Sequence, residues 1–344
     1  MELTVWGCRG SYPEPGADTV KYGGNTSCYA LKTSAGLIIL DAGNGLIRLG
    51  RDLIKDAVAK RRSPTGINAK VLVSHGHVDH RSGWSFFGPA YIPGNSFSVY
   101  GPAKVVTAIS KTRSHGEHGK PGTETFVRSR RRNSVEVFLS ANTISDGHPV
   151  DLKDQIARGA TLDMFDLEGK VTADKIYDPS FGQVVVEFIH GNHLTSSLMY
   201  KITDGGVSVV YTGDYEHGNL LLKSEHPLFH PEKPVVFDSF FIDFLVGADV
   251  VIADSQYGPH DYPKKTGWGH TMAEEALRHV AKAAHKSGKR IHTILTHHEP
   301  ENTDAFLDKR EWDLEQFVAR ENLFHHITWE LARDGMVREI KSQG

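Results

Sequence analysis

Three histidines and an aspartate lie within one short segment, HGHVDH at residues 75–80. The apolar run at residues 71–74 precedes it and predicts a strand. Because alternate residues of an extended or tightly turned segment point the same way, His75 and His77 can bind one ion while Asp79 and His80 turn towards a second. A histidine-rich surface loop is the alternative, but this spacing at a strand end favours a site for two metal ions.

The segment matches in full the HxHxDH signature of the metallo-β-lactamase superfamily, which the chain resembles. A second segment, LIILDAG at residues 37–43, resembles the superfamily strand that ends in a buried aspartate, here Asp41. The resemblance implies that Asp41 orients the metal-binding loop. It also implies an α/β fold, the four-layer αββα sandwich of the metallo-β-lactamase fold, with metal ions at the strand ends.

The same resemblance implies that the remaining metal ligands lie at the ends of three later strand-like runs. His193, Asp214 and His297 each follow one of these runs. We assign three histidines to the first ion, one aspartate and two histidines to the second, and one aspartate to the bridge between them. The ligands of the first ion are His75, His77 and His193. Those of the second are Asp79, His80 and His297, and the bridging aspartate is Asp214.

Imidazole and carboxylate ligands suit zinc, manganese or iron, and this set needs no cysteine. We therefore expect two divalent metal ions, zinc before manganese or iron. A bridging carboxylate such as Asp214 holds two cations about 3.5–4 Å apart, so that they can share one hydroxide. Water on such ions loses a proton near neutral pH, which provides a nucleophile without a serine or cysteine.

Some of these assignments have an alternative. His190 is the alternative to His193 in its segment, and Asp214 follows a glycine, where an Asx-turn is common. His297 and His298 are adjacent and cannot both face the metal from a strand. The position in the Leu-Thr-His motif favours His297 as the ligand. His298 would then either support a metal ligand from outside the coordination sphere or face solvent.

Further segments resemble the branch that contains tRNase Z and small phosphodiesterases, including enzymes for cyclic nucleotides: GCRGS at 7–11, YGGNTS at 22–27, ADVVIADS at 248–255 and GHT at 269–271. That resemblance implies that His270 lies near the scissile phosphate, where it would protonate the leaving oxygen or stabilise the phosphorane. Alternatively, His270 only neighbours a helix N-cap, which Thr271 can provide while His270 faces the cleft. The predicted catalytic residues are Asp79, Asp214 and His270.

The chain also departs from its relatives. Only residues 194–213 separate His193 from Asp214, which leaves no room for the long tRNA-binding arm of tRNase Z. Asp254 replaces the glutamate of that branch's His-Glu pair and Ala253 replaces its histidine, so any network built on that histidine is absent. A lactamase is disfavoured, because lactamases lack the bridging aspartate and their zinc-binding cysteine has no match here.

Composition agrees with an intracellular enzyme. The chain has 344 residues, 39% of them hydrophobic and 24% charged, enough for one large domain or two small ones. No apolar run approaches the ~20 residues of a membrane span, and the N-terminus resembles a strand more than a signal peptide. The two cysteines, Cys8 and Cys28, imply no disulfide framework, so we expect a cytoplasmic protein without membrane contact.

Strands are predicted at residues 3–6, 27–32, 37–40, 71–74, 97–100, 184–189, 198–202, 207–211, 250–253 and 292–295. Helical periodicity is found at 46–60, 271–286 and 306–320. Residues 327–331 and 336–340 are predicted to form a closing hairpin about Asp334-Gly335, a turn-forming pair. Because no linker interrupts this pattern, we predict a single metallo-hydrolase domain over residues 1–344.

A polar, basic segment at about 111–179 fits this pattern least well. We interpret it as a loop or arm insertion over the site, where basic side chains would attract an anionic substrate. An ordinary solvated loop or a subunit contact is the alternative. His115 and His118 lack the carboxylates that a third metal site would need.

The leading hypothesis is a binuclear metal-dependent hydrolase, a phosphodiesterase that cleaves a small or cyclic nucleotide phosphodiester with a metal-bridging hydroxide. The alternatives are a hydrolase for lactones or thioesters on the same metal centre, an RNA endonuclease, and a non-catalytic metal-dependent binding protein. The net charge of −3 argues against extensive nucleic-acid binding. The expected partner is a small anionic phosphodiester, and a homodimer is the expected assembly because the related branch is commonly dimeric.

Overall fold

The computed structural model describes residues 1–60, 62–102, 161–167, 174–218 and 237–342. Residues 111–160 of the predicted arm, with His115 and His118, lie outside the described residues. None of the helices in the described ranges combines the length and the apolar character that crossing a bilayer requires.

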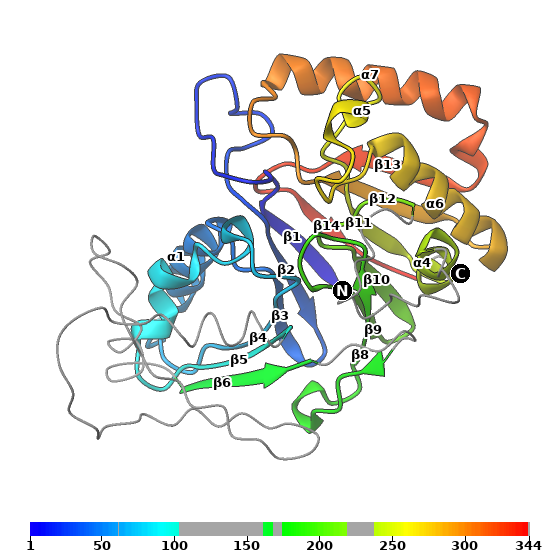
Figure 1. Cartoon of the computed structure of the whole chain (residues 1–344). Helices are drawn as coiled ribbons and strands as arrows, with labels where there is room; N and C mark the ends of the chain where they lie inside the picture. The colour runs from blue at the N-terminus through cyan, green and yellow to red at the C-terminus, as the bar shows by residue number, and fades with distance from the viewer. Residues whose placement is uncertain (61, 103–160, 168–173, 219–236, 343–344) are drawn as a thin grey trace, which may run out of the picture.

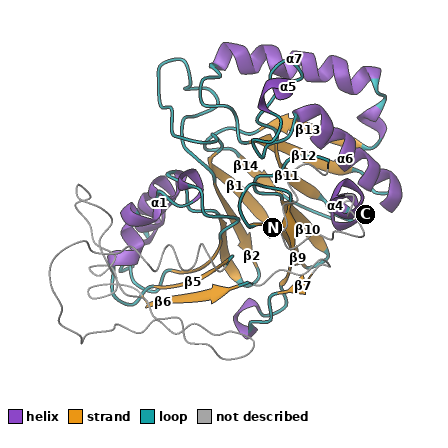
Figure 2. Ribbon diagram, in the orientation of Figure 1, coloured by secondary structure: helices purple, strands orange, loops and turns teal. Residues whose placement is uncertain are grey.

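Two seven-stranded sheets form the centre of the fold (Figure 2). The first sheet has the order β14-β1-β2-β3-β4-β5-β6, and the second has the order β13-β12-β11-β10-β9-β8-β7. The strands of the first sheet are β1 (Glu2–Gly7), β2 (Cys28–Thr33), β3 (Gly36–Leu40), β4 (Asn68–Leu72), β5 (Ser96–Gly101), β6 (Thr161–Asp166) and β14 (Val337–Glu339). Those of the second are β7 (Asp174–Lys175), β8 (Val185–Gly191), β9 (Ser197–Asp204), β10 (Val207–Tyr211), β11 (Val250–Asp254), β12 (Ile291–Thr296) and β13 (Ile327–Leu331).

Helices cover the outer faces of both sheets. They are α1 (Gly45–Ala59), α4 (Phe237–Leu245), α6 (Ala273–Ser287) and α7 (Asp304–Arg320), while the one-turn helix α5 (Tyr262–Lys265) lies in the loop before α6. Figure 1 shows α1 on one side of the sheets, and α4, α6 and α7 on the other. The three helices predicted from the sequence correspond to α1, α6 and α7, with small shifts of their ends.

Three buried apolar clusters fill the spaces between the four layers, because successive side chains of a strand point to opposite faces. In β3, Ile38 and Leu40 belong to the cluster between the sheets, whereas Ile39 packs in the cluster that contains α1 residues. In β10, Val209 belongs to the cluster between the sheets, and Val210 packs in the cluster formed with α4, α6 and α7. The predicted αββα sandwich is therefore confirmed.

The strand directions determine where the polar strand ends meet. β3, β4 and β5 run parallel, and so do β10, β11 and β12. β9 is antiparallel to both β8 and β10, so β8 points the same way as β10. The residues that follow these strands are therefore collected at one edge of each sheet.

The predicted closing hairpin is wrong. β13 pairs in parallel with β12 in the second sheet, whereas β14 pairs antiparallel with β1 in the first. The Asp334-Gly335 turn carries the chain from one sheet to the other, and Gly335 N–H donates to Val5 O at 2.7 Å. The turn forms as expected, but each flanking strand extends a different sheet because β1 and β12 each offer it a backbone edge.

Two edge strands replace part of the predicted loop or arm. β6 pairs in parallel with β5, and β7 pairs antiparallel with β8. The prediction of an irregular segment is therefore wrong for residues 161–166 and 174–175. Backbone pairing with an existing sheet edge stabilises these short strands even though their sequence periodicity is weak.

Candidate metal centre

The seven side chains predicted as metal ligands lie together at the common edge of the strand ends. Four come from the segment after β4, and one each follows β8, β10 and β12. Of these seven, only His77 is partly exposed. Segments that are far apart in the sequence thus form one buried polar cluster at this edge of the sandwich.

One group of donor atoms comes from His75, His77, His193 and Asp214, all within 4.8 Å of one another. His193 Nε2 lies 3.2 Å from His77 Nδ1, and His75 Nε2 lies 3.3 Å from Asp214 Oδ2. This is the set that the sequence assigns to the first ion. His190, the alternative to His193, is not part of it.

A second group comes from Asp79, His80, Asp214 and His297. His80 Nε2 lies 3.1 Å from Asp79 Oδ2 and 3.2 Å from Asp214 Oδ2. His297 Nε2 lies 3.2 Å from Asp79 Oδ2 and 3.2 Å from Asp214 Oδ1. Asp214 belongs to both groups, which is the position expected of a bridging carboxylate.

A third group joins Asp254 and His270 to Asp214 and His297. His270 Nδ1 lies 3.0 Å from Asp254 Oδ2 and 3.9 Å from Asp214 Oδ2, and the His270 ring stacks on His297 with centroids 4.8 Å apart. Sequence reasoning missed the role of Asp254 as a partner of His270. The resemblance at residues 248–255 could have indicated this role, because Asp254 occupies the position of the acidic residue in that branch.

The expectation that Thr271 caps the following helix is wrong. The N-cap of α6 is Met272, which makes no side-chain cap. Thr271 Oγ1 instead lies 2.8 Å from His217 Nδ1. His270 nevertheless faces the cluster, because its ring is held by Asp254 rather than by the helix end.

The outer nitrogens of three imidazoles have hydrogen-bond partners that orient the rings. His80 Nδ1 donates to Asp41 Oδ2 at 2.6 Å, and His193 Nδ1 donates to Gly269 O at 2.8 Å. His297 Nδ1 donates to Gln256 Oε1 at 2.9 Å. Each bond fixes the tautomer that directs the Nε2 lone pair into the cluster, as in metal sites with oriented histidines.

Asp41 is held in turn by three donors. It accepts hydrogen bonds from Ser74 N at 2.6 Å, Ser74 Oγ at 2.7 Å and Tyr211 OH at 2.5 Å. Because Tyr211 lies in the second sheet and Asp41 follows a strand of the first, these bonds tie the two halves together beneath the cluster. The implied role of Asp41 in orienting the metal-binding loop agrees with this geometry.

The donor set fits divalent metal ions. His75 Nε2 and both carboxylate oxygens of Asp214 are buried and make no hydrogen bond with the described residues. A buried carboxylate without donors is costly, and a bound cation would compensate that cost. Two ligands on one tetrahedral ion with bonds of about 2.0–2.1 Å lie about 3.4 Å apart, close to the spacings found here.

The electrostatics differ between the two sides of the cluster. Burial lowers the pKa of His193 to about 3 and that of His75 well below its usual range, so both rings are neutral. Burial also acts to lower the pKa of His297, but the Asp214 and Asp79 carboxylates outweigh it and raise the pKa to about 9. The carboxylates thus hold a proton on His297, and metal ions would have to displace that proton.

Unusual backbone conformations gather at this site. Four described non-glycine residues have φ in the left-handed region, and three of them contact the cluster. Asp41 (φ +58°) binds His80, Ser11 (φ +58°) donates its N–H to Asp79 Oδ2 at 2.8 Å, and His297 (φ +63°) belongs to the cluster itself. Strained residues of this kind concentrate at functional sites.

The left-handed backbone also separates His297 from His298. His297 turns into the cluster directly after β12, while His298 Nε2 donates to Ala332 O at 2.9 Å. Burial lowers the pKa of His298 to about 4. His298 is therefore a buried packing residue, and the expectation that it could face solvent is wrong.

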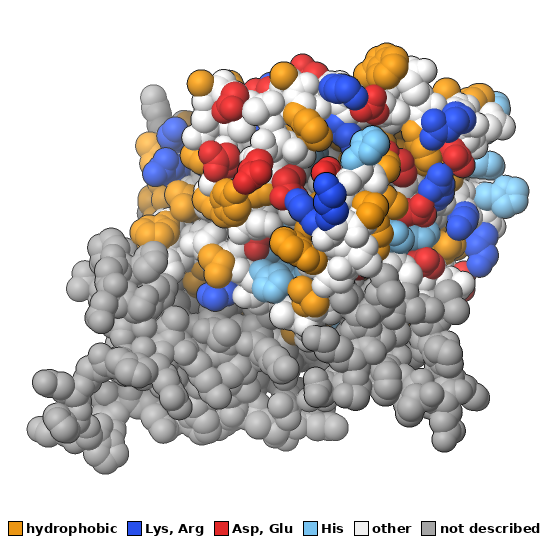
Figure 3. All heavy atoms as spheres, turned by 45° about the horizontal axis from the view of Figure 1, so that its top comes forward, with side chains coloured by type: hydrophobic (Ala, Val, Ile, Leu, Met, Phe, Trp, Pro, Cys, Tyr) orange, Lys and Arg blue, Asp and Glu red, His pale blue; other side chains and the backbone are white. Residues whose placement is uncertain are grey.

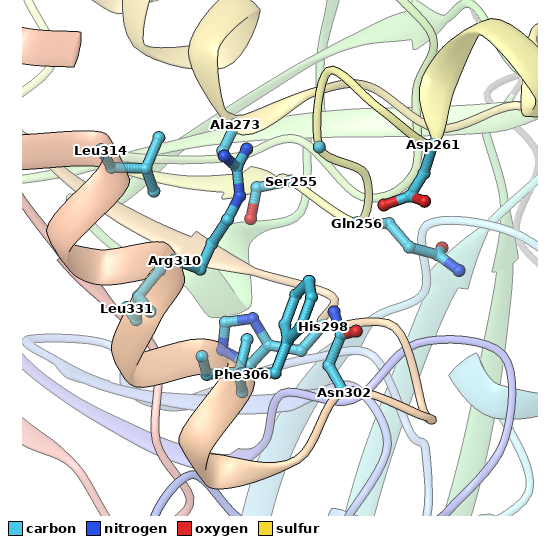
Figure 4. Close-up of a pocket in the computed structure, with 12 residues that line it drawn as sticks. Ser255, Gln256, Asp261, Ala273, His298, Asn302, Phe306, Arg310, Leu314 and Leu331 are labelled. Carbon is cyan, nitrogen blue, oxygen red and sulfur yellow. The ribbon is translucent and has the colours of Figure 1, made fainter. Parts of the chain in front are cut away.

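A small pocket lies on the other side of Gln256, the residue that binds His297 (Figure 4). Ser255, His298 and Arg310 are among the residues around it, and none of the donor groups lines it. Arg310 is neutralised by Glu274, with Nη1 2.7 Å from Oε1. The pocket is a packing gap beneath α7, and the chemistry belongs to the cluster.

Comparisons with known proteins agree with this arrangement. No protein-family model and no curated protein matches the sequence. Solved structures do match: the metallo-β-lactamase fold protein YhfI from Bacillus subtilis is 18% identical, with a TM-score of 0.55, over 98% of this chain and 99% of that one. The short form of human tRNase Z is 17% identical, with a TM-score of 0.52, over 99% and 100%.

Zn²⁺-bound PqqB from Methylobacterium extorquens is 13% identical, with a TM-score of 0.55, over 98% of this chain and 100% of that one. All three similarities extend along almost the whole chain, so they concern the complete sandwich. Together with the two seven-stranded sheets and the polar cluster at their shared edge, they confirm at the level of the fold the resemblance that HGHVDH indicates. The chain has the metallo-β-lactamase fold, which it shares with tRNase Z.

Proposed function

We propose that the chain is a metal-dependent hydrolase that binds two divalent ions and cleaves a small anionic phosphodiester. The observation that carries this proposal is Asp214, a buried carboxylate that lies in all three donor groups and makes no hydrogen bond with the described residues. A single carboxylate shared by these groups suits a pair of cations better than a single cation. The Zn²⁺-bound PqqB structure with the same fold supports zinc as the first candidate.

The proposed ligands divide as the donor groups do. His75, His77 and His193 would hold one ion, Asp79, His80 and His297 the other, and Asp214 would bridge them. Two such cations neutralise phosphoryl oxygens and lower the pKa of water so that it can act as the nucleophile.

His270 would act as the acid for the leaving group. Its Nδ1 lies 3.0 Å from Asp254 Oδ2, so the carboxylate orients the ring and would stabilise the imidazolium from which Nε2 donates a proton. An alkoxide leaving group needs such a proton whereas a thiolate does not, so this pairing favours an oxygen ester such as a phosphodiester over a thioester. Residue 270 is almost fully buried, which would protect the transfer from bulk water.

A small substrate is favoured over a nucleic acid. The net charge is −3, and among the described residues coloured in Figure 3 basic and acidic side chains are interspersed. Binding along a phosphate backbone requires many cations in one stripe.

The test is a substrate panel on protein loaded with zinc or manganese, with elemental analysis of the same samples. We expect two ions per chain and turnover of bis(p-nitrophenyl) phosphate that disappears after chelation. Faster turnover of a lactone or thioester would favour the acyl hydrolase. One ion per chain in fully active protein would exclude the binuclear site.

A further inference from the structure

Three exposed apolar residues stand next in sequence to His77, His193 and Gly269. Trp268 is 59% exposed, Val78 is 62% exposed and Leu194 is 45% exposed. Single exposed apolar residues are ordinary on protein surfaces, but several around one site indicate a contact surface. We call Val78, Leu194 and Trp268 the apolar rim.

Each member of the apolar rim is the sequence neighbour of His193 or of a residue that contacts the His193 ring. Leu194 follows His193 directly in the sequence. Val78 follows His77, whose Nδ1 lies 3.2 Å from His193 Nε2. On the other side of the ring, Trp268 precedes the residue whose carbonyl accepts the His193 Nδ1 proton at 2.8 Å. The backbone of each rim residue therefore lies next to the first donor group.

A buried glutamate fixes the backbone on both sides of Trp268. Glu216 is fully buried, and its carboxylate accepts hydrogen bonds from the N–H groups of Gly267, at 2.8 and 3.0 Å, and of Gly269, at 2.9 Å. It also accepts the Tyr262 hydroxyl at 2.8 Å. No ion pair of Glu216 is found among the described residues, so its charge is stabilised by this loop.

This arrangement prepares Trp268 for binding. An indole whose backbone is already fixed loses little conformational entropy when a ligand packs on it. Its flat apolar face suits a planar group, and base or aryl rings stack on such side chains without needing a particular hydrogen-bond pattern. A phosphodiester whose phosphate lies at the cluster would extend its second ester group towards the neighbouring rim.

We propose that the apolar rim binds a planar apolar group of the substrate, with Trp268 as the contact residue and Glu216 as the positioning residue. The inference rests on the proposed function, because it assigns the substrate class within it: phosphodiesters with an aryl or similar planar group on the phosphate. Trp268 would then determine specificity without touching the reacting atoms.

The first experiment measures binding and does not depend on turnover. Phenylphosphonate and methylphosphonate carry the same anionic head and differ only in the group that would reach the rim. We expect phenylphosphonate to bind zinc-loaded protein about tenfold more tightly in calorimetric titrations, and Trp268→Ala to abolish this preference. Trp312→Ala is the matched control, because Trp312 is also 59% exposed but lies in α7.

The second experiment compares bis(p-nitrophenyl) phosphate with methyl p-nitrophenyl phosphate, which share a leaving group. Trp268→Ala should raise KM for the aryl diester about tenfold with little change in kcat, and Trp268→Phe should restore most of the difference. Glu216→Gln places an amide N–H₂ against two backbone donors, so it should weaken the aryl preference, and the zinc content is measured in the same samples. The Trp268 variants test the proposed contact between Trp268 and the substrate even if Glu216→Gln does not fold.

The outcomes separate the two proposals. The proposal for the apolar rim is overturned if the wild-type protein binds phenylphosphonate and methylphosphonate equally well, or binds neither. It is also overturned if Trp268→Ala keeps the preference for phenylphosphonate. A phenyl preference that depends on Trp268, in a protein that hydrolyses no phosphodiester, leaves the rim standing and overturns the phosphodiesterase.

Discussion

Asp214 brings a carboxylate into the interior between His80 and His297, and burial alone would raise its pKa. The neighbouring histidines, with His297 first, outweigh burial and hold the pKa of Asp214 well below its usual range. The carboxylate is therefore ionised, and its oxygens are directed at the imidazoles of both groups. A charge held in this way, without hydrogen-bond donors among the described residues, defines the centre.

We predict that Asp214→Ala loses both ions. Each of the two proposed ion sites then keeps only three ligands, and the bridge between the sites is missing. Elemental analysis should find less than one ion per chain, and turnover of bis(p-nitrophenyl) phosphate should fall by about 10³-fold or more. Retention of two tightly bound ions would contradict the bridging assignment.

Adjacent histidines provide a second prediction at this scale. His297→Ala should lower metal content, whereas His298→Ala should keep it and reduce stability by about 1–3 kcal/mol, because His298 donates a buried hydrogen bond to Ala332 O. Thermal unfolding and elemental analysis of both variants test this. Equal metal loss in the two variants would refute the choice of His297.

His270→Ala should retain its metal ions and lose rate in a way that depends on the leaving group. An acid that protonates the departing oxygen matters most for poor leaving groups, so we expect a loss of about 10²–10⁴-fold for alkyl esters and a small loss for p-nitrophenyl esters. Rates across a series of leaving-group pKa values measure this. A uniform loss would argue that His270 only positions its neighbours.

At the scale of elements, the site depends on loops that leave the strand ends in fixed directions. The Glu216 carboxylate holds the loop at 262–269 in place by accepting hydrogen bonds from the backbone N–H groups of Gly267 and Gly269. The Gly269 carbonyl of this loop orients His193. Gly269 is required there for two reasons. Its φ is +94°, and a Cβ at this position would lie 2.4 Å from His193 Nδ1.

Two glycines of this loop form a matched pair for a test. Gly267 also has positive φ, +87°, but a Cβ there would meet nothing within 4 Å. We predict that Gly269→Ala weakens metal binding by about 10–100-fold because it displaces His193, whereas Gly267→Ala costs only about 1–2 kcal/mol of backbone strain. Zinc titration against a competing chelator distinguishes them, and equal metal affinities would contradict the proposed role of Gly269.

At the scale of the whole molecule, the cluster between the sheets joins both halves of the chain, because it contains buried residues of each sheet. We propose on this ground that the described residues fold as one domain. The homodimer and the cytoplasmic location stay predictions of the sequence.

An ion pair also links the two sheets at the edge formed by β13 and β14. Arg338 Nε donates to Glu330 Oε1 at 2.7 Å, and His292 Nε2 lies 3.0 Å from the same oxygen. Burial acts to raise the pKa of Glu330, but its bonds to His292 and Arg338 outweigh burial and lower the pKa to about 2.

The direction of this shift predicts a dependence on pH. A carboxyl group with a depressed pKa stabilises the fold above its unfolded pKa of about 4.3, and this contribution is lost as the pH falls towards 2. We expect Glu330→Gln to lose about 2 kcal/mol at pH 6 relative to wild type, and the difference to vanish near pH 2. Urea unfolding of metal-free protein measures it, with the exposed Glu339→Gln as control; a difference independent of pH would contradict the ion pair.

The sequence by itself determined the strand-end motif, the main helices and the layered architecture, because periodicity and local spacing act over a few residues. HGHVDH predicted four of the clustered side chains directly, since neighbours in one turn cannot lie far apart. The resemblance then supplied His193, Asp214 and His297, which no local pattern could have joined to that segment.

Only the tertiary structure decided which distant groups meet. The pairing of Asp254 with His270, the separate sheets of β13 and β14, and the fixation of Trp268 by Glu216 each join segments through backbone direction or buried hydrogen bonds. Such contacts depend on how two sheets pack, and a local sequence window contains no information about that packing. The left-handed turn at His297 is of the same kind, since the surrounding fold holds a conformation that the residue itself disfavours.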